Sequence, residues 1–230
     1  MQTVEVSVAD RVRAVREAIA TAAERADRDP AVIAVVAVSK SVGREAVDVA
    51  HTAGIRHFGE NRVADAERKF AGSRPSNTTL HLIGQLQSNK ARPAAHLFDL
   101  IESVDRASLI DALEKEADRL GRPIPVLLQV NVAGESQKAG CDPQAALGLA
   151  SRLGASPAFA LHGLMTIAPL VEDAEAVRPV FRALRELRDR LRDDTSLPLD
   201  VLSMGMTNDF VVAVEEGATH VRVGRAIFSP

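Results

Sequence analysis

The sequence predicts an α/β protein built as a single (β/α)8 barrel of the TIM type, with one extra helix at its N-terminus and one domain over residues 1–230. Three observations indicate this fold. About eight short apolar runs alternate with helical stretches, the connections are short, and no linker rich in proline, glycine or serine divides the chain. A doubly wound open sheet is the alternative that fits the same alternation.

The first apolar run covers residues 32–40 and ends on Lys40. A nearly continuous β-branched run suits a strand buried on both faces of a parallel sheet. Lys40 therefore lies at the carboxyl end of a strand, where such folds hold their ligands. Its ammonium could simply point into water. Alternatively, partial burial would lower the pKa of the amine and leave a nucleophile for a carbonyl ligand.

The other expected strands are apolar runs that end in polar or glycine-containing loops. They cover residues 55–58, 79–83, 98–102, 125–131, 158–164, 199–202 and 220–223.

Helices are expected between these strands, and several carry recognisable end signals. Ser7 and Asp10 form a potential capping box in a helix over residues 4–28 that packs on the barrel. Gly54 suits a C-terminal cap, and Pro143 suits a first helical position. The remaining helices are expected at 44–53, from the segment 59–62 to about 70, and at 106–120, 143–153, 173–193 and 208–216.

Composition excludes several classes of function. The net charge is −3 and only 3% of the residues are aromatic, which argues against a nucleic-acid partner or an anionic membrane surface. The sequence has no apolar stretch long enough to span a bilayer and no signal peptide. Cys141 is the single cysteine, which favours a cytoplasmic protein, and the six histidines show no metal-ligand spacing.

Two loops near the C-terminus predict an anion site. Residues 203–207 and 224–225 follow the last two strands and supply hydroxyls, glycines and the start of a helix. Barrels often bind phosphate at this place. Each loop alone reads best as an ordinary turn, but together, at the edge that holds Lys40, they favour phosphate.

Arg222 is unusual because it lies between Val221 and Val223 in a strand, so alternation turns it toward the barrel interior if the valines face the helices. A buried guanidinium needs an acceptor. A ligand atom and an inward acid such as Glu102 are equally good candidates.

Two further polar segments, residues 59–62 and 85–90, follow the second and third strands and would line the mouth of the barrel. Their alternative interpretation is that they start helices with capping groups. An amine, a phosphate site and an arginine at one edge fit pyridoxal 5′-phosphate held on Lys40 as a Schiff base.

Six sequence blocks, in order along nearly the whole chain, resemble those of the pyridoxal phosphate homeostasis protein family. They are Ala37-Val38-Ser39-Lys40, residues 58–63, residues 81–90, Gly163-Leu164-Met165-Thr166, residues 203–206 and residues 221–224. The resemblance implies a barrel like the N-terminal domain of alanine racemase. It further implies a covalently held cofactor and a role in vitamin B6 and amino-acid homeostasis, without an established enzymatic reaction.

The resemblance also implies roles for individual residues. Lys40 would form the Schiff base, Asn61 would lie near the ring, and Arg222 would approach the pyridine nitrogen, where a permanent positive charge weakens the ring as an electron sink. The residues expected around the phosphate are Ser203, Gly205, Met206, Thr207, Gly224 and Arg225. This chain departs from the family where Thr207 replaces a common serine and where Arg225 replaces a common threonine.

The leading hypothesis is therefore a protein that stores, delivers or buffers pyridoxal phosphate, with cofactor-dependent apoenzymes as possible recipients. The main alternative is an amino-acid racemase. That enzyme needs a tyrosine as its second base, and the sequence contains none and ends without the second domain of racemases. The absent domain favours a monomer. A barrel enzyme acting on a phosphorylated metabolite, with Lys40 trapping a carbonyl, is a third possibility.

Overall fold

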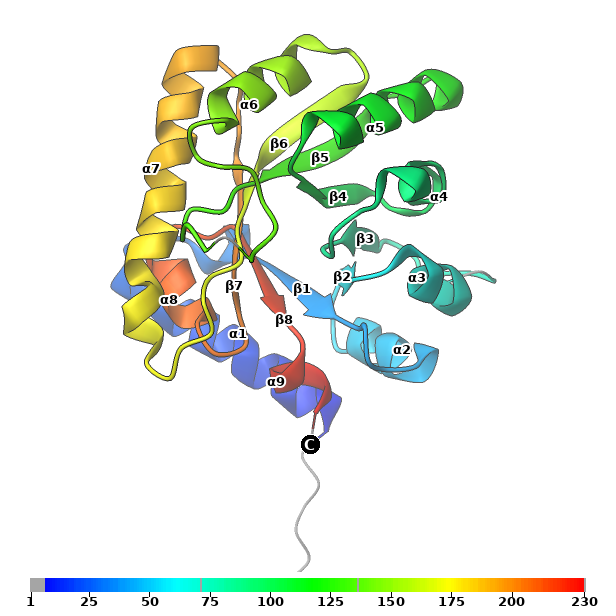
Figure 1. The fold of residues 1–230 in the computed structure, drawn as a ribbon. Helices are drawn as coiled ribbons and strands as arrows, with labels where there is room; N and C mark the ends of the chain where they lie inside the picture. Colours follow the sequence, from blue (N-terminus) through cyan, green and yellow to red (C-terminus); the bar gives the residue numbers. More distant parts are fainter. Residues whose placement is uncertain (1–6, 71, 136, 230) are drawn as a thin grey trace, which may run out of the picture.

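The computed structural model describes residues 7–70, 72–135 and 137–229, and within them eight parallel strands close into a barrel in the order β1 to β8 (Figure 1). The barrel closes where β8 pairs with β1, with Val36 opposite Arg222. The strands are β1 (Ala34–Val38), β2 (His57–Glu60), β3 (Thr79–Leu82), β4 (Leu100–Val104), β5 (Ile124–Gln129), β6 (Phe159–Met165), β7 (Val201–Met206) and β8 (His220–Val223). The predicted barrel is confirmed, and the open sheet is excluded.

Helices surround the strands. The α-helices are α1 (Val8–Arg25), α2 (Arg44–Thr52), α3 (Val63–Phe70), α4 (Ala91–Leu97), α5 (Ala107–Leu120), α6 (Ala146–Ala155), α7 (Arg178–Thr195), α8 (Phe210–Glu215) and α9 (Arg225–Phe228), and the short 3-10 helices are η1 (Pro30–Val32), η2 (Ser88–Lys90) and η3 (Ala174–Val177). None of those helices is long and apolar enough to cross a membrane.

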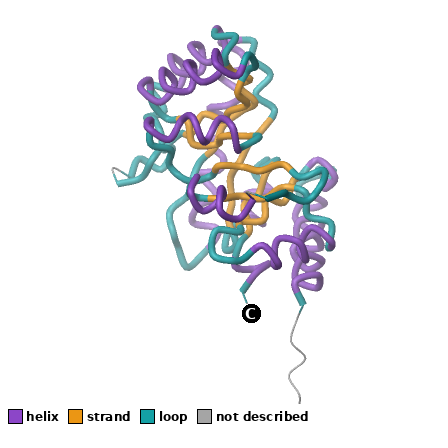
Figure 2. Tube along the Cα trace, turned by 90° about the vertical axis from the view of Figure 1, so that its right-hand side faces the viewer, coloured by secondary structure: helices purple, strands orange, loops and turns teal. Residues whose placement is uncertain are grey.

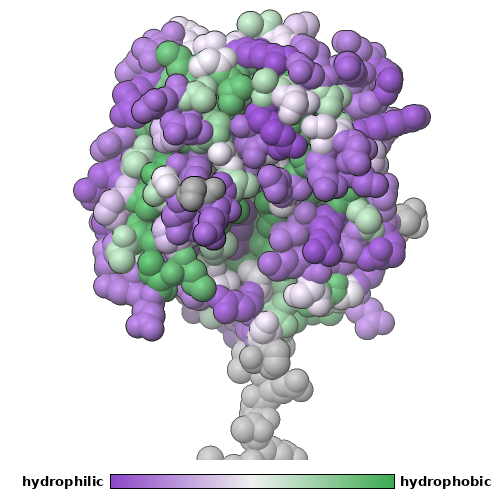
Figure 3. Space-filling view, in the orientation of Figure 1, coloured by the Kyte–Doolittle hydropathy of each residue, from purple (hydrophilic) through white to green (hydrophobic). Residues whose placement is uncertain are grey.

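The extra N-terminal helix is present as α1. It begins after Ser7, which forms the predicted capping box with Asp10. Residues 4–6 of the expected helix lie outside the described residues. Val12, Val15 and Ile19 are buried on one face of α1, and the helix packs against α2, α8 and α9 (Figure 1). Figure 2 shows helices around the outside of the strands. Figure 3 shows a mainly hydrophilic outer face with apolar residues between the charged ones.

Most boundaries lie within a few residues of the prediction, and three differences are larger or have a clear cause. The seventh strand starts later and runs further than residues 199–202, since Ser203 pairs with Met165 on one side and with His220 on the other. The helix expected over 173–193 is divided at Arg178, because Pro179 suits a new first turn better than a helix interior. The sequence analysis predicts no helix at 91–97, where α4 forms with Pro93 in its first turn.

Candidate functional site

A cavity of about 640 Å³ lies at the carboxyl edge of the barrel. Apolar side chains of Val38, Ile83, Ile167 and Leu170 form part of its wall. Seven of the nine predicted site residues line it: Lys40, Asn61, Met206, Thr207, Arg222, Gly224 and Arg225. Residues far apart in the sequence therefore meet around one cavity. Because they are the residues predicted to bind the cofactor, we call this cavity the cofactor pocket.

Lys40 lies in the turn that directly follows β1, and its side chain is exposed at the rim of the cofactor pocket. Of the two alternatives, the structure shows the side chain of Lys40 in the water-facing one. Any desolvation of Lys40 has to come from a ligand that covers it.

The residue before Lys40 is fixed by a buried ion pair. Ser39 donates its hydroxyl to the Glu60 carboxylate at 2.7 Å, and Lys69 donates to the same carboxylate oxygen at 2.5 Å. Lys69 also donates to the backbone carbonyl of Ser39. The Glu60 side chain is fully buried and that of Lys69 is 9% exposed. Because Ser39 is held from two sides, the end of β1 is rigid where it presents Lys40. The sequence gives no direct sign of this role of Lys69, which lies in the last turn of the amphipathic helix α3.

Arg222 faces the barrel interior as predicted, and its side chain is almost completely buried. It donates to the Ser203 hydroxyl and to the Thr166 carbonyl, both at 2.7 Å. Ser203 in turn donates to Glu102 at 2.6 Å. Burial lowers the pKa of Arg222, although the negative charges of Glu102 and Asp209 act in the opposite direction. The predicted partner Glu102 is therefore present, but it reaches Arg222 through a hydroxyl, and Arg222 still lines the cofactor pocket.

Three histidines meet in the barrel interior, which the sequence analysis did not foresee. His57, His81 and His220 have ring centroids 5.2–5.8 Å apart. Burial lowers the pKa of His57 and of His220 to about 4. No group of three or more His, Cys, Asp or Glu in the described part of the chain is arranged to hold a metal ion.

His81 connects this cluster to the arginine. Its Nδ1 lies 2.6 Å from Glu102, and its Nε2 lies 3.0 Å from Nδ1 of His57. Burial alone would raise the pKa of Glu102, but the hydrogen bond and charge of His81, together with the charge of Arg222, lower it to about 2. A continuous chain of hydrogen bonds therefore crosses the interior from His57 to Arg222. Its members come from different strands, so no local spacing signals it.

Ser203 and Gly205 are the two predicted residues that do not line the cofactor pocket. Ser203 is fully buried between Arg222 and Glu102. Gly205 has a φ of +89°, and a Cβ there would meet the Cβ of Ala213 at 2.5 Å, so glycine allows α8 to pack closely on β7. Any contact of these two residues with a ligand stays a prediction from the resemblance.

The predicted anion end of the cofactor pocket is formed by the loops after β7 and β8. Thr207 and the exposed Arg225 line it, and Arg225 donates to the Asn208 side chain at 3.2 Å. Asp209 also lines the pocket; it accepts the Met206 N–H at 2.5 Å and so fixes the turn. Burial raises the pKa of Asp209 above its ordinary value.

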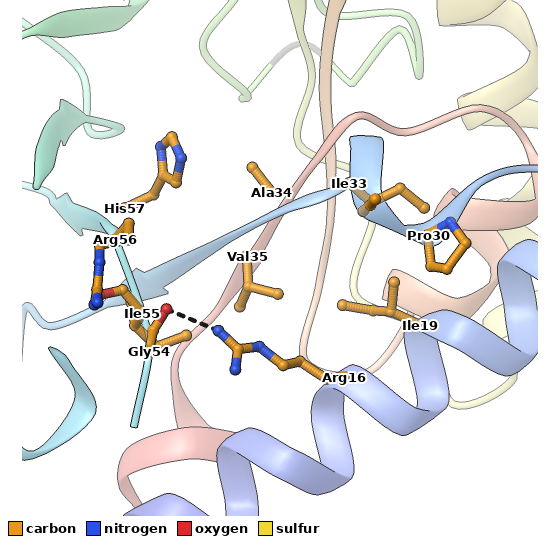
Figure 4. A pocket seen from close by; sticks show the side chains of 11 residues that line it. Arg16, Ile19, Pro30, Ile33, Ala34, Val35, Gly54, Ile55, Arg56 and His57 are labelled. Carbon is orange, nitrogen blue, oxygen red and sulfur yellow. Dashed lines mark hydrogen bonds between the residues drawn. The ribbon is translucent and has the colours of Figure 1, made fainter. Parts of the chain in front are cut away.

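A different cavity of about 470 Å³ lies at the opposite, amino end of the barrel between α1 and the starts of β1 and β2 (Figure 4). The Arg16 guanidinium donates to the Gly54 carbonyl there at 2.7 Å. His57 is in its wall, but none of the predicted cofactor residues is. This cavity is therefore separate from the candidate site.

Comparisons with known proteins agree with the observed barrel. The family model for the alanine racemase N-terminal domain matches residues 11–230. A pyridoxal phosphate homeostasis protein of Pseudomonas aeruginosa is 41% identical over 222 residues, covering 96% of this chain and 95% of that protein. A protein of the same name from Aquifex aeolicus is 40% identical, covering 95% of this chain and 96% of that protein.

Solved structures show the same similarity. PipY of Synechococcus elongatus, whose structure has pyridoxal phosphate bound, superposes with a TM-score of 0.85 at 38% identity, covering 97% of this chain and 100% of that one. D-Threonine aldolase of Filomicrobium marinum superposes with a TM-score of 0.73 at 16% identity, covering 93% of this chain and 59% of that one. The second likeness concerns the fold alone.

Proposed function

Because this chain belongs to the family of pyridoxal phosphate homeostasis proteins, we propose that it binds pyridoxal 5′-phosphate in the cofactor pocket and holds it covalently on Lys40. One observation carries the proposal. The amine of Lys40, the buried guanidinium of Arg222 and the hydroxyl and guanidinium of Thr207 and Arg225 line a single cavity.

The residues present fit the chemistry of this group. An aldehyde needs an amine, a phosphate needs hydroxyl and cationic donors, and a pyridine ring needs apolar walls. Lys40 supplies the amine, Thr207 and Arg225 supply the hydroxyl and cationic donors, and the side chains of Ile83 and Ile167 supply part of the apolar wall. The relatives named above support the same group, since one of them was solved with it bound.

The bound cofactor supplies an aldehyde that an amine can trap with loss of water, and otherwise the protein's own residues set the outcome. The rigid end of β1 presents Lys40. We assign Arg222 to the ring nitrogen, as the family resemblance implies. A guanidinium fixed by Ser203 and Thr166 has no proton to give at neutral pH, so it keeps that nitrogen unprotonated and disfavours carbanion chemistry. Holding the cofactor, rather than transforming substrates, fits this arrangement.

Mass mapping tests the covalent link. Wild-type protein incubated with pyridoxal phosphate and reduced with borohydride should carry one reduced adduct, on the peptide that contains Lys40. Lys40→Ala should lose it, whereas Lys115→Ala on the outer helix α5 should keep it. An adduct on another lysine, or a colourless protein with no adduct, would overturn the proposal.

Racemase activity is expected to be absent or at trace level, because the chain contains no tyrosine to act as the second base. Measuring the interconversion of L- and D-alanine by the cofactor-loaded protein tests this expectation. Robust turnover would replace the carrier function with the racemase alternative.

We further propose that the protein acts as a monomer in the cytoplasm and passes the cofactor to apoenzymes. Cys141 is a free, buried thiol whose pKa is raised to about 12 by burial, which fits a reducing compartment. Light scattering on the loaded protein tests the monomeric state, and transfer assays with an apoenzyme test the delivery of the cofactor.

A further inference from the structure

A second cavity of about 600 Å³ adjoins the cofactor pocket. The two share three lining residues, Asn61, Gly84 and Gln85. Gly84 and Asn61 pack closely in this common wall, because a Cβ on Gly84 would lie only 2.1 Å from the backbone oxygen of Asn61. The cavity is lined by residues from 61–67 and 82–93, which overlap the two polar segments 59–62 and 85–90 that follow the second and third strands. We call it the side pocket.

The side pocket is lined by two cations, Arg62 and Lys90, that come from different loops. Within the described residues, neither forms an ion pair. The nearby carboxylates are engaged elsewhere, Glu60 with Lys69 and Asp65 with Arg68. Two like charges at one cavity repel each other. The single acid in the described wall, Glu67, offsets only one of them, so a bound anion would neutralise the positive charge that remains.

The backbone adds to the positive potential. Arg62 directly precedes α3, and Val63 and Ala64 of its first turn are in the wall of the side pocket. First-turn N–H groups have no partner inside their own helix, and this end of the helix carries partial positive charge. Arg62, Lys90 and the start of α3 therefore favour the same kind of ligand.

The charge of the ligand follows from the one acid in the described wall. Glu67 lines the side pocket together with Arg62 and Lys90, so a net single positive charge remains. One monoanion balances it, whereas a phosphate dianion would meet the repulsion of Glu67. A planar carboxylate also matches the two parallel donors of a guanidinium.

We propose that the side pocket is a binding site for small carboxylate ligands, held by Arg62 and Lys90 next to the cofactor pocket. The site is formed by the protein itself and does not depend on a bound cofactor. A ligand there would lie beside Asn61 and Gly84, in position to affect access to Lys40 across the shared wall.

Backbone amide NMR of the full chain, with acetate as the probe and sodium chloride keeping the ionic strength constant, tests the site. We expect saturable shifts of the Val63 and Ala64 amides. Arg62→Gln and Lys90→Gln should each weaken the affinity by about tenfold, as expected for loss of one charge-assisted contact. Arg92→Gln removes an exposed charge from the neighbouring α4 outside the side pocket and should change nothing, and the spectra themselves report whether each variant is folded.

Two results would overturn the proposal. Shifts that grow without saturation, or that persist unchanged in Arg62→Gln, would show general salt effects. Inorganic phosphate that binds tenfold tighter than acetate at the Val63 and Ala64 amides would exclude the carboxylate class. Failure of cofactor binding is seen separately, as missing shifts of the Gly224 and Arg225 amides when pyridoxal phosphate is added.

Discussion

The rim and the interior of the same barrel use charged side chains in opposite ways. At the rim, Lys40 and Arg225 are exposed and face a cavity. In the interior, His81, Glu102 and Arg222 are buried, and each is hydrogen-bonded to the next polar group. Charges that the fold itself satisfies serve the structure, whereas charges left at the rim are available to a ligand. Arg222 belongs to both regions, since it is fixed from below and lines the pocket.

Removing Glu102 should have the largest effect on stability. Glu102→Ala would leave Arg222 buried without its nearest negative charge and would remove an acceptor from His81 and Ser203. Breaking a buried charge network in this way typically costs about 3–5 kcal/mol of the free energy of unfolding. Urea unfolding measures the loss. Glu102→Gln removes the charge but keeps the shape and one acceptor, so it should lose less. Equal losses in the two variants would assign the whole effect to the charge, and a loss in Glu102→Gln close to zero would argue against an electrostatic role.

Lys69→Met should cost about 3 kcal/mol, because the fully buried Glu60 loses its cation. The same change removes one of the two holds on Ser39, so the covalent adduct on Lys40 should also form more slowly. Lys69→Arg, which keeps the charge, should recover most of the rate. A normal adduct rate in Lys69→Met would show that the buried pair stabilises the barrel without positioning Lys40.

Stability should fall as the pH is lowered from 6.5 to 4. His220 has its pKa lowered from 6.5 to about 4 by burial, so in this window the unfolded chain binds a proton that the folded protein does not. Stability then rises with pH, and His220 alone contributes roughly 3 kcal/mol between the two limits. His220→Asn should flatten the dependence measured by urea unfolding. His57, whose pKa burial also lowers to about 4, should make a comparable contribution, and an unchanged slope in His220→Asn would mean that His220 titrates normally.

Glu102 acts in a lower pH window. Its pKa of about 2 lies below its ordinary value of 4.5, so it stabilises the folded protein above pH 4.5 and loses this effect as the pH falls toward 2. The two windows separate the histidine cluster from the carboxylate in a single pH series.

The sequence predicts the rim far better than the interior. Lys40, Thr207 and Arg225 follow strand ends, and parallel strands bring such ends to one edge of a barrel. The contacts of His57, His81 and Glu102 depend instead on which strands lie opposite each other and on side-chain reach across the interior, which no local spacing encodes. Ser203 shows the same limit of prediction from local sequence. The sequence assigns it to an exit loop, whereas it lies inside β7 and donates its hydroxyl to Glu102.

The smallest effect is expected at Arg225, a position where the family resemblance implies threonine. Its guanidinium is exposed, so solvent screens its charge, and Arg225→Thr should weaken the affinity for pyridoxal phosphate by about 1 kcal/mol, or roughly fivefold, at low salt. The difference should shrink at high salt, and Arg225→Lys, which keeps the charge, should bind nearly as the wild type does. Fluorescence titration at two salt concentrations measures both. Because Asn208 already holds this side chain near the loop after β7, an unchanged affinity at low salt would mean that Arg225 serves that contact and not the phosphate.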